Sequence, residues 1–336
     1  MEYTQIGRSG LRVSRQILGA MNFGAATDRE TSGQIINEAL DAGINAIDTA
    51  DCYSHGLSEE IVGETLAQNG RRDDVVIATK FTTHMGQGPN DWGQSRYHIV
   101  QACEASLRRL KTDRIDLYQA HWMDMVTPLE EMLRALDDLV RQGKVRYIGV
   151  SKFACALIAE AALLARQYGW TPLTSEQPPY NILDRSIERE LVWTCKRYGL
   201  GIIPWGPLAS GILSGRYRRG NIPKDSRSAQ HGIGPTRMSK GALKAVEALL
   251  PLAEGKGVTL AEFSLAWLLH QPGVTAPLIG PRTPEHLHSC LKAVDVKLSE
   301  ADLKAVDEIN PPGHSLSAYH SENVDARLRK DIFGNP

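Results

Sequence analysis

Short apolar runs alternate with longer segments of helical periodicity along almost all of the 336 residues. The runs predict eight strands, at 16–20, 46–48, 75–80, 115–121, 145–150, 174–177, 201–204 and 276–279. Each strand is followed by helix, at 28–42, 58–68, 98–110, 127–142, 154–168, 186–198, 240–254 with 260–270, and 284–293. Strict alternation requires a parallel sheet covered by helices, and eight such units close a (β/α)8 TIM barrel.

The rival arrangement is an open, doubly wound sheet, whose first turn carries the phosphate-binding pattern G-x-G-x-x-G. That pattern occurs nowhere in the chain. A glycine follows several of the helical segments, as expected where a left-handed residue ends a helix. These glycines are Gly43, Gly143, Gly169 and Gly199. The barrel is therefore the favoured fold.

The residues outside the eight predicted strand–helix units are predicted to be additions to one barrel rather than a second domain. Alternating residues at 3–6 and 11–14 predict an N-terminal β-hairpin in 1–15, and the barrel itself occupies 16–294. An extra C-terminal helix starting at Ser299, with a tail, fills 295–336. The glycine-containing segment 217–237 predicts a long loop that closes over a ligand. All of 1–336 is then a single domain.

Composition excludes several classes of partner. The 38 Lys and Arg against 39 Asp and Glu give a net charge of −1, which provides no basis for binding nucleic acid or an anionic membrane. The five cysteines are scattered without zinc-type spacing, as in a reducing cytoplasm. No leader and no run of 18 apolar residues is found, so we expect a cytoplasmic protein, monomer or homo-oligomer, acting on a small molecule.

Ionisable residues stand at the ends of three consecutive predicted strands, where barrel enzymes place their chemistry. Asp48, Lys80 and His121 end these strands, and Tyr53 follows five residues after Asp48. Each of these side chains alone is consistent with a polar residue at a strand end whose hydrogen bonds are made within the protein. Together, a carboxylate, an ammonium, an imidazole and a phenol suit proton transfer to an oxygen. A neighbouring ammonium favours the phenolate and is expected to lower the Tyr53 pKa. A metal-dependent hydrolase using Asp48, His55, His84 and His121 is an alternative, although it gives Lys80 and Tyr53 no role.

These residues carry a resemblance to a known family. Asp48-Thr-Ala-Asp-Cys-Tyr53, the strand ending at Lys80 and the strand ending at His121 resemble the Asp, Tyr, Lys, His tetrad of the aldo-keto reductase superfamily. The stretches 43–63 and 143–153 resemble its signatures. The resemblance implies a (β/α)8 barrel that binds NADPH without a Rossmann domain and without a metal, and Asp48, Tyr53, Lys80 and His121 as its catalytic residues.

The same resemblance implies a track of cofactor-binding residues. Ser151 and Gln177 match a Ser and a Gln that bind the nicotinamide carboxamide, Lys152 stands where Asn is usual, and Trp205 matches the stacking aromatic. The pyrophosphate loop is matched by Gly206, Pro207, Leu208, Gly211 and Leu213. The site of the adenosine 2′-phosphate, which favours NADP over NAD, is matched by Gly280, Arg282 and Thr283. His286 and Cys290 replace the Gln and Asn that often face adenine.

The resemblance implies reduction of an aldehyde or ketone by hydride transfer, with Tyr53 as the general acid. We expect Trp92, Trp122 and Tyr180 to line the substrate side. One alternative is an NADPH-binding regulatory subunit with little turnover, as in the potassium-channel β subunits. Another lies within the same class: the stretch from Glu176 to Asn181 resembles bacterial members, some of which act on keto-sugars or enoyl-sugar nucleotides.

Overall fold

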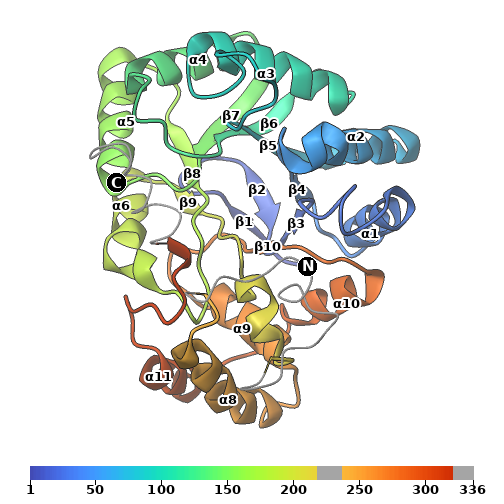
Figure 1. Cartoon of the computed structure of the whole chain (residues 1–336), viewed down its shortest axis with the longest axis vertical. Helices are drawn as coiled ribbons and strands as arrows, with labels where there is room; N and C mark the ends of the chain where they lie inside the picture. The colour runs from blue at the N-terminus through green and yellow to red at the C-terminus, as the bar shows by residue number, and fades with distance from the viewer. Residues whose placement is uncertain (218–236, 321–336) are drawn as a thin grey trace.

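A computed structural model describes residues 1–217 and 237–320, and most of the predicted loop and tail lies outside them. Eight parallel strands form one sheet in the order β10-β3-β4-β5-β6-β7-β8-β9. The strands are β3 (Ile17–Gly19), β4 (Ala46–Asp48), β5 (Val76–Phe81), β6 (Ile115–Ala120), β7 (Val145–Val150), β8 (Leu173–Glu176), β9 (Gly201–Ile202) and β10 (Leu278–Ile279). Figure 1 shows them at the centre of the molecule with helices around them.

The first and last strands of this order meet, so the sheet closes into the predicted barrel. The Thr275 N–H donates to the Ile202 carbonyl at 2.8 Å, and the Leu278 N–H donates to the Pro204 carbonyl at 2.9 Å. Both strands at this seam are shorter than predicted. Pro204 and Pro277 lie beside them, and proline has no N–H to donate to a ladder.

The predicted hairpin is present and plugs one end of the barrel. Strands β1 (Tyr3–Gln5) and β2 (Arg12–Ser14) pair antiparallel. Ile6 and Val13 bury their side chains against Ile17 and Ala46, which begin β3 and β4. The hairpin therefore covers the amino ends of the strands and leaves the carboxyl ends for a site.

The helices cover the outside of the barrel. They are α1 (Arg29–Asp41), α2 (Leu57–Asn69), α3 (Arg96–Arg109), α4 (Leu129–Arg141), α5 (Cys155–Tyr168), α6 (Leu191–Tyr198), α8 (Lys240–Glu254), α9 (Leu260–Leu269), α10 (Pro284–Lys292) and α11 (Glu300–Ile309). Gly169 and Gly199 end α5 and α6 with φ of 66° and 84°, as predicted. Ser299 caps α11, the predicted extra helix. In the described ranges, no helix is long and apolar enough to cross a membrane.

The helix predicted over 186–198 is interrupted. A 3-10 turn, η3 (Ser186–Arg189), precedes α6, and between them Glu190 has φ −147°, outside the helical region. The buried guanidinium of Arg185 binds both carboxylate oxygens of Glu188, at 2.7 and 3.0 Å, and also binds Asp307 of α11. These bonds hold the tight turn in place ahead of α6.

Candidate active site

The carboxyl ends of β4 and β5 bring a buried ion pair together beside a phenol. Asp48 ends β4 and Lys80 lies in β5, with a side chain that is 0% exposed. The Lys80 ammonium donates to Asp48 Oδ1, to the Thr49 carbonyl at 2.8 Å and to the Tyr53 hydroxyl at 3.3 Å. All three ammonium hydrogens therefore have acceptors, which buried ion pairs require.

The second oxygen of Asp48 is held by two amides. Gln119 Nε2 donates to Asp48 Oδ2 at 3.1 Å, and Gln177 Nε2 donates to it at 2.8 Å. Gln119 lies in β6 and was not predicted as a site residue. An amide in the strand segment that leads directly to His121 is the signal that could have identified it. The two amides fix the direction of the carboxylate, and thereby that of the ammonium.

Tyr53 is a protonated phenol in this site. Burial raises the pKa of Tyr53 to about 12, and the opposing pull of the Lys80 charge is smaller. Lys80 lowers this pKa, as expected, but the effect of burial is larger and the pKa rises overall. Burial also disfavours the ammonium form of Lys80, but the charge of Asp48 raises its pKa overall. Near neutral pH the pair consists of a charged ammonium and a neutral phenol.

His121 directly follows β6 and faces Tyr53. The two ring centroids are 5.6 Å apart, with the planes at 83°. Its Nδ1 lies 3.7 Å from Cys52 Sγ, a contact that was not predicted. Burial, and then the charges of Lys152 and Lys80, hold the pKa of His121 well below its ordinary value. The imidazole is therefore neutral and can donate one N–H to an oxygen.

The predicted substrate residues take different places. Trp122 stacks on His121 with centroids 6.0 Å apart, and the Lys152 ammonium lies 3.3 Å from the Trp122 centroid and 5.8 Å from that of Trp205. Trp92 stacks on His84 in the loop after β5, at 5.0 Å. Tyr180 is 1% exposed and directs its hydroxyl to Glu188 at 2.5 Å, with its ring on Trp267. The hydroxyl of Tyr180 therefore points into the core and not toward the predicted substrate side.

The turn after β7 is held by a buried carboxylate. Lys152 has φ +59°, a conformation that costs a lysine about 1 kcal/mol. The N–H groups of Lys152 and Phe153 donate to Glu176 Oε1 at 2.7 and 3.3 Å. Ser151 donates to the Gln177 carbonyl at 2.8 Å. Glu176 is thus the group that fixes the positions of Lys152 and Phe153, which the sequence alone did not indicate.

The segment from Trp205 to Leu213 forms successive left-handed turns. Positive φ values occur at Gly206 (66°), Ala209 (49°), Ser210 (56°) and Gly211 (95°). Turns of this kind point backbone N–H groups into a concavity that suits anions. Open space adjoins Gly206, because a Cβ built there meets no atom within 4 Å. Within this segment, Pro207 and Leu213 are buried and Leu208 is partly exposed.

The Trp205 indole Nε1 is buried without a hydrogen-bond partner in the described part of the chain. A buried indole N–H normally finds an acceptor. Trp205 lies edge-on to Tyr319, with ring centroids 6.1 Å apart. Its neighbours thus leave one donor available to a ligand.

The last strand leads to a polar segment at the start of α10. Gly280 is exposed, Arg282 is partly exposed, and the Thr283 hydroxyl accepts from the N–H of His286 at 3.3 Å as the helix cap. A helix start with an adjacent guanidinium suits a phosphate. His286 is exposed, whereas Cys290 is buried. His286 and Cys290 stand where the family often has the Gln and Asn that face adenine, and of these two residues only His286 presents its side chain to solvent.

The residues of the hydrolase alternative are not gathered into a metal site. Among residues 1–217 and 237–320, no three His, Cys, Asp or Glu side chains lie close enough to hold an ion. His84 stacks on Trp92, and Asp48 is fully engaged by Lys80 and the two amides. The structure therefore does not support that alternative.

Comparison with known proteins agrees with this geometry. The model of the aldo/keto reductase family matches residues 16–311. An uncharacterized oxidoreductase of Bacillus subtilis is 42% identical over 95% of this chain and 99% of its own length. A probable voltage-gated potassium channel β subunit of rice is 38% identical, covering 88% of this chain and 92% of the relative. Versiconal hemiacetal acetate reductase of Aspergillus parasiticus is 35% identical, covering 92% and 96%. The chain belongs to the aldo/keto reductase family.

Proposed function

We propose that the chain is an NADPH-dependent carbonyl reductase, which converts an aldehyde or ketone to an alcohol with Tyr53 as the general acid. The observation that carries the proposal is the buried chain of bonds from Asp48 through Lys80 to the Tyr53 hydroxyl. The names of the relatives as oxidoreductase and reductase support the reaction class. All five cysteines are free, which supports a reducing, cytoplasmic setting.

The residues present fit a nicotinamide dinucleotide. The unpartnered indole N–H of Trp205 would contact the nicotinamide. The left-handed turns at 206–211 would hold the pyrophosphate, and the polar start of α10 would hold the 2′-phosphate. We assign the 2′-phosphate to Arg282 and Thr283, because a guanidinium and a hydroxyl at a helix start match its charge. When bound, the reduced nicotinamide supplies a hydride. We assign the carboxamide to Ser151 and Gln177, beside Lys152.

The side chains of the site then perform the proton chemistry. Tyr53 holds a proton near neutral pH and gives it to the alkoxide oxygen that forms from the carbonyl. Lys80 stays charged and stabilises the phenolate left behind. The neutral His121 donates an N–H to the same oxygen and orients the carbonyl. We assign Trp122 and Trp92 to the substrate side of the site.

The Tyr53→Phe variant tests this assignment. It removes only the hydroxyl, so we expect carbonyl reduction to fall by about 10²–10⁴-fold. NADPH affinity should stay close to that of the wild type and exceed NADH affinity in both proteins. The measurements are loss of reduced-nicotinamide absorbance with a panel of aldehydes and ketones, and fluorescence titration with each dinucleotide. Wild-type turnover in the variant would refute the role of Tyr53.

A second candidate function has support from the relatives. Two plant proteins named as probable voltage-gated potassium channel β subunits are 38% and 37% identical to this chain. A regulatory subunit that binds NADPH needs the cofactor track but little turnover. Wild-type turnover below about one per minute on every carbonyl of the panel, far under ordinary enzyme rates, together with tight NADPH binding, would favour that function.

A further inference from the structure

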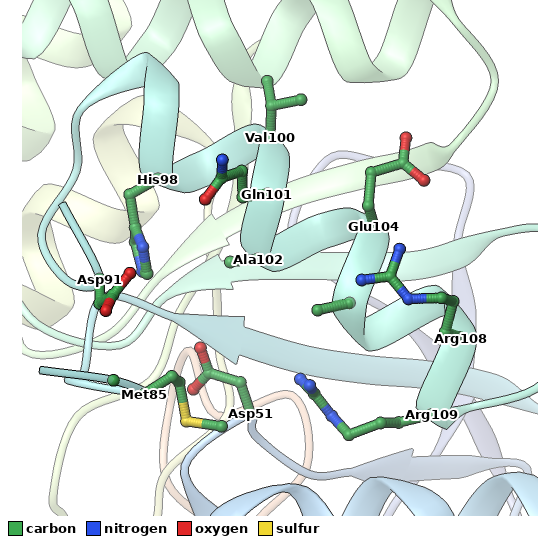
Figure 2. Close-up of a pocket in the computed structure, with 12 residues that line it drawn as sticks. Asp51, Met85, Asp91, His98, Val100, Gln101, Ala102, Glu104, Arg108 and Arg109 are labelled. Atoms are coloured by element: carbon green, nitrogen blue, oxygen red, sulfur yellow. The ribbon is translucent and has the colours of Figure 1, made fainter. Parts of the chain in front are cut away.

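A cavity of about 490 Å³ lies between α3 and the loops that follow β4 and β5. None of the residues assigned above to catalysis, cofactor or substrate lines it. Figure 2 shows Asp51 from the first loop and Asp91 from the second facing His98 of α3 across the same space. We call this cavity the α3 pocket. Its volume lies in the range of small-molecule sites, about 300–1,000 Å³.

The inner wall of the α3 pocket holds polar groups that have no hydrogen-bond partner. Asp51 is 1% exposed, and neither of its carboxylate oxygens is bonded in the described part of the chain. His98 is 4% exposed, and its Nε2 is likewise unpartnered. More than nine in ten buried polar groups in proteins are satisfied, so two such side chains on one cavity wall are unusual. They indicate that a ligand completes the wall.

The charges around the pocket favour a cation. The nearest guanidinium, that of Arg109, donates to the buried Glu59 carboxylate at 2.6 Å, so its charge is already compensated. Arg108 stands at the exposed side of α3. The wall also holds the acidic side chains of Asp51, which is buried, and Asp91, which is partly exposed, and the carboxylate form of Asp51 would attract a cation.

We propose that the α3 pocket binds a small organic cation, an amidinium or a primary ammonium on a compact apolar body. Its N–H groups donate to the Asp51 carboxylate, which is the unsatisfied acceptor. Its apolar body lies against Met85, Ala102 and Ala105. Met85 has an unbranched, adaptable side chain that can move to admit it.

Binding of this kind is coupled to pH. Burial, and then the charge of Glu59 on α2, raise the pKa of Asp51 to about 8, against smaller opposing effects of the neighbouring Cys52 backbone N–H, of Arg109 on α3 and of Lys80 on β5. The empty site therefore holds a neutral carboxyl near pH 7. A cation requires the carboxylate, so it binds with release of a proton, and its affinity rises with pH up to about 8.

Calorimetric titration with benzamidinium chloride tests the proposal, with sodium benzoate as the probe of opposite charge and similar shape. We expect one saturable site for benzamidinium, about 25-fold tighter at pH 8.5 than at pH 6.5, and no site for benzoate. Asp51→Asn should weaken binding at least about tenfold and remove its pH dependence. Saturable benzoate binding, or none for benzamidinium at pH 8.5, would overturn the proposal.

Two matched variants locate the site without removing the carboxylate. Ala105→Phe fills the α3 pocket with an apolar ring and should abolish benzamidinium binding, whereas Arg108→Ala should leave it equal or tighter. Circular dichroism establishes that each variant is folded. Unchanged affinity in Ala105→Phe would place the cation elsewhere and refute the assignment. The titration measures no turnover, so its outcome is independent of carbonyl reduction.

Discussion

Lys80 is the residue on which the geometry of the candidate site depends most. Its ammonium is buried completely and bonded to Asp48, Thr49 and Tyr53 together. Ion pairs of this kind contribute little net stability compared with apolar residues, because desolvation offsets their attraction. Removing one partner is different, since the other charge is then left uncompensated.

The Lys80→Met variant is therefore expected to lose about 3–5 kcal/mol of unfolding free energy, because the Asp48 carboxylate stays buried without its cation. Adding Asp48→Asn to this variant should restore much of the loss. Urea denaturation of the single and double variants, followed by circular dichroism, gives both values. A double variant no more stable than Lys80→Met would show that the pair is not coupled in this way.

The sequence predicted the gathering of Asp48, Lys80 and His121 because parallel strands end at one edge of the sheet. It could not predict which way a side chain turns or how deeply it is buried. Tyr180 points into the core, and the pKa of Tyr53 rises where the charge of Lys80 alone would lower it. Glu176 was read as part of a motif, and its bonds to a left-handed turn emerge only in the fold.

The position of the N-terminal hairpin depends on a close contact between the backbone of Gly7 and that of Gly199. Gly7 has φ +56°, and a Cβ built there would lie 2.2 Å from the Gly199 carbonyl oxygen. The neighbouring Arg8 N–H donates to that same oxygen at 2.9 Å. A side chain at Gly7 is therefore strained in conformation and sterically blocked.

We expect Gly7→Ala to destabilise the chain by about 1–3 kcal/mol. Gly10, in the same hairpin, is the matched control, because a Cβ there meets no atom within 4 Å. Gly10→Ala should change the unfolding free energy by less than about 0.5 kcal/mol. Equal urea midpoints for the two variants would argue against a tight contact at Gly7.

Within the described ranges, sequence periodicity located the strands and α-helices of the barrel, with most boundaries within two residues. The differences have local causes. Proline shortens the strands at the seam, and the bonds of Arg185 to Glu188 separate η3 from α6. Periodicity reports which residues share a face, but it does not report a polar network that redirects the backbone.

At the scale of the whole molecule, two buried carboxyls control how stability changes with pH. Burial raises the pKa values of Asp51 and Glu176 to about 8 each. In the unfolded chain these groups titrate near pH 4. Between about pH 4 and 8 the folded chain therefore binds more protons, and the unfolding free energy falls as pH rises. The lowered pKa values of His98 and His121 act oppositely, but mainly below about pH 6.5.

The window from pH 7 to 8 isolates the carboxyls, and each should reduce the unfolding free energy there by about 1 kcal/mol. Glu176→Gln keeps the acceptor for the Lys152 N–H and removes the titration, so we expect about half of this decline. Urea denaturation at pH 7.0, 7.5 and 8.0 measures it. An identical decline in wild type and variant would contradict a raised pKa at Glu176.

The order of strands in the sheet also sets a delay during synthesis of the chain. β3 pairs with β4 on one side and with β10 on the other, although about 260 residues separate Ile17 from Leu278. At 5–20 residues per second, the ribosome takes about 13–50 s to supply that partner. Throughout this interval the free edge of β3 is a template for pairing with other nascent chains. Capture by a chaperone that binds unpaired edges is therefore useful to this protein from the synthesis of β3 until that of β10.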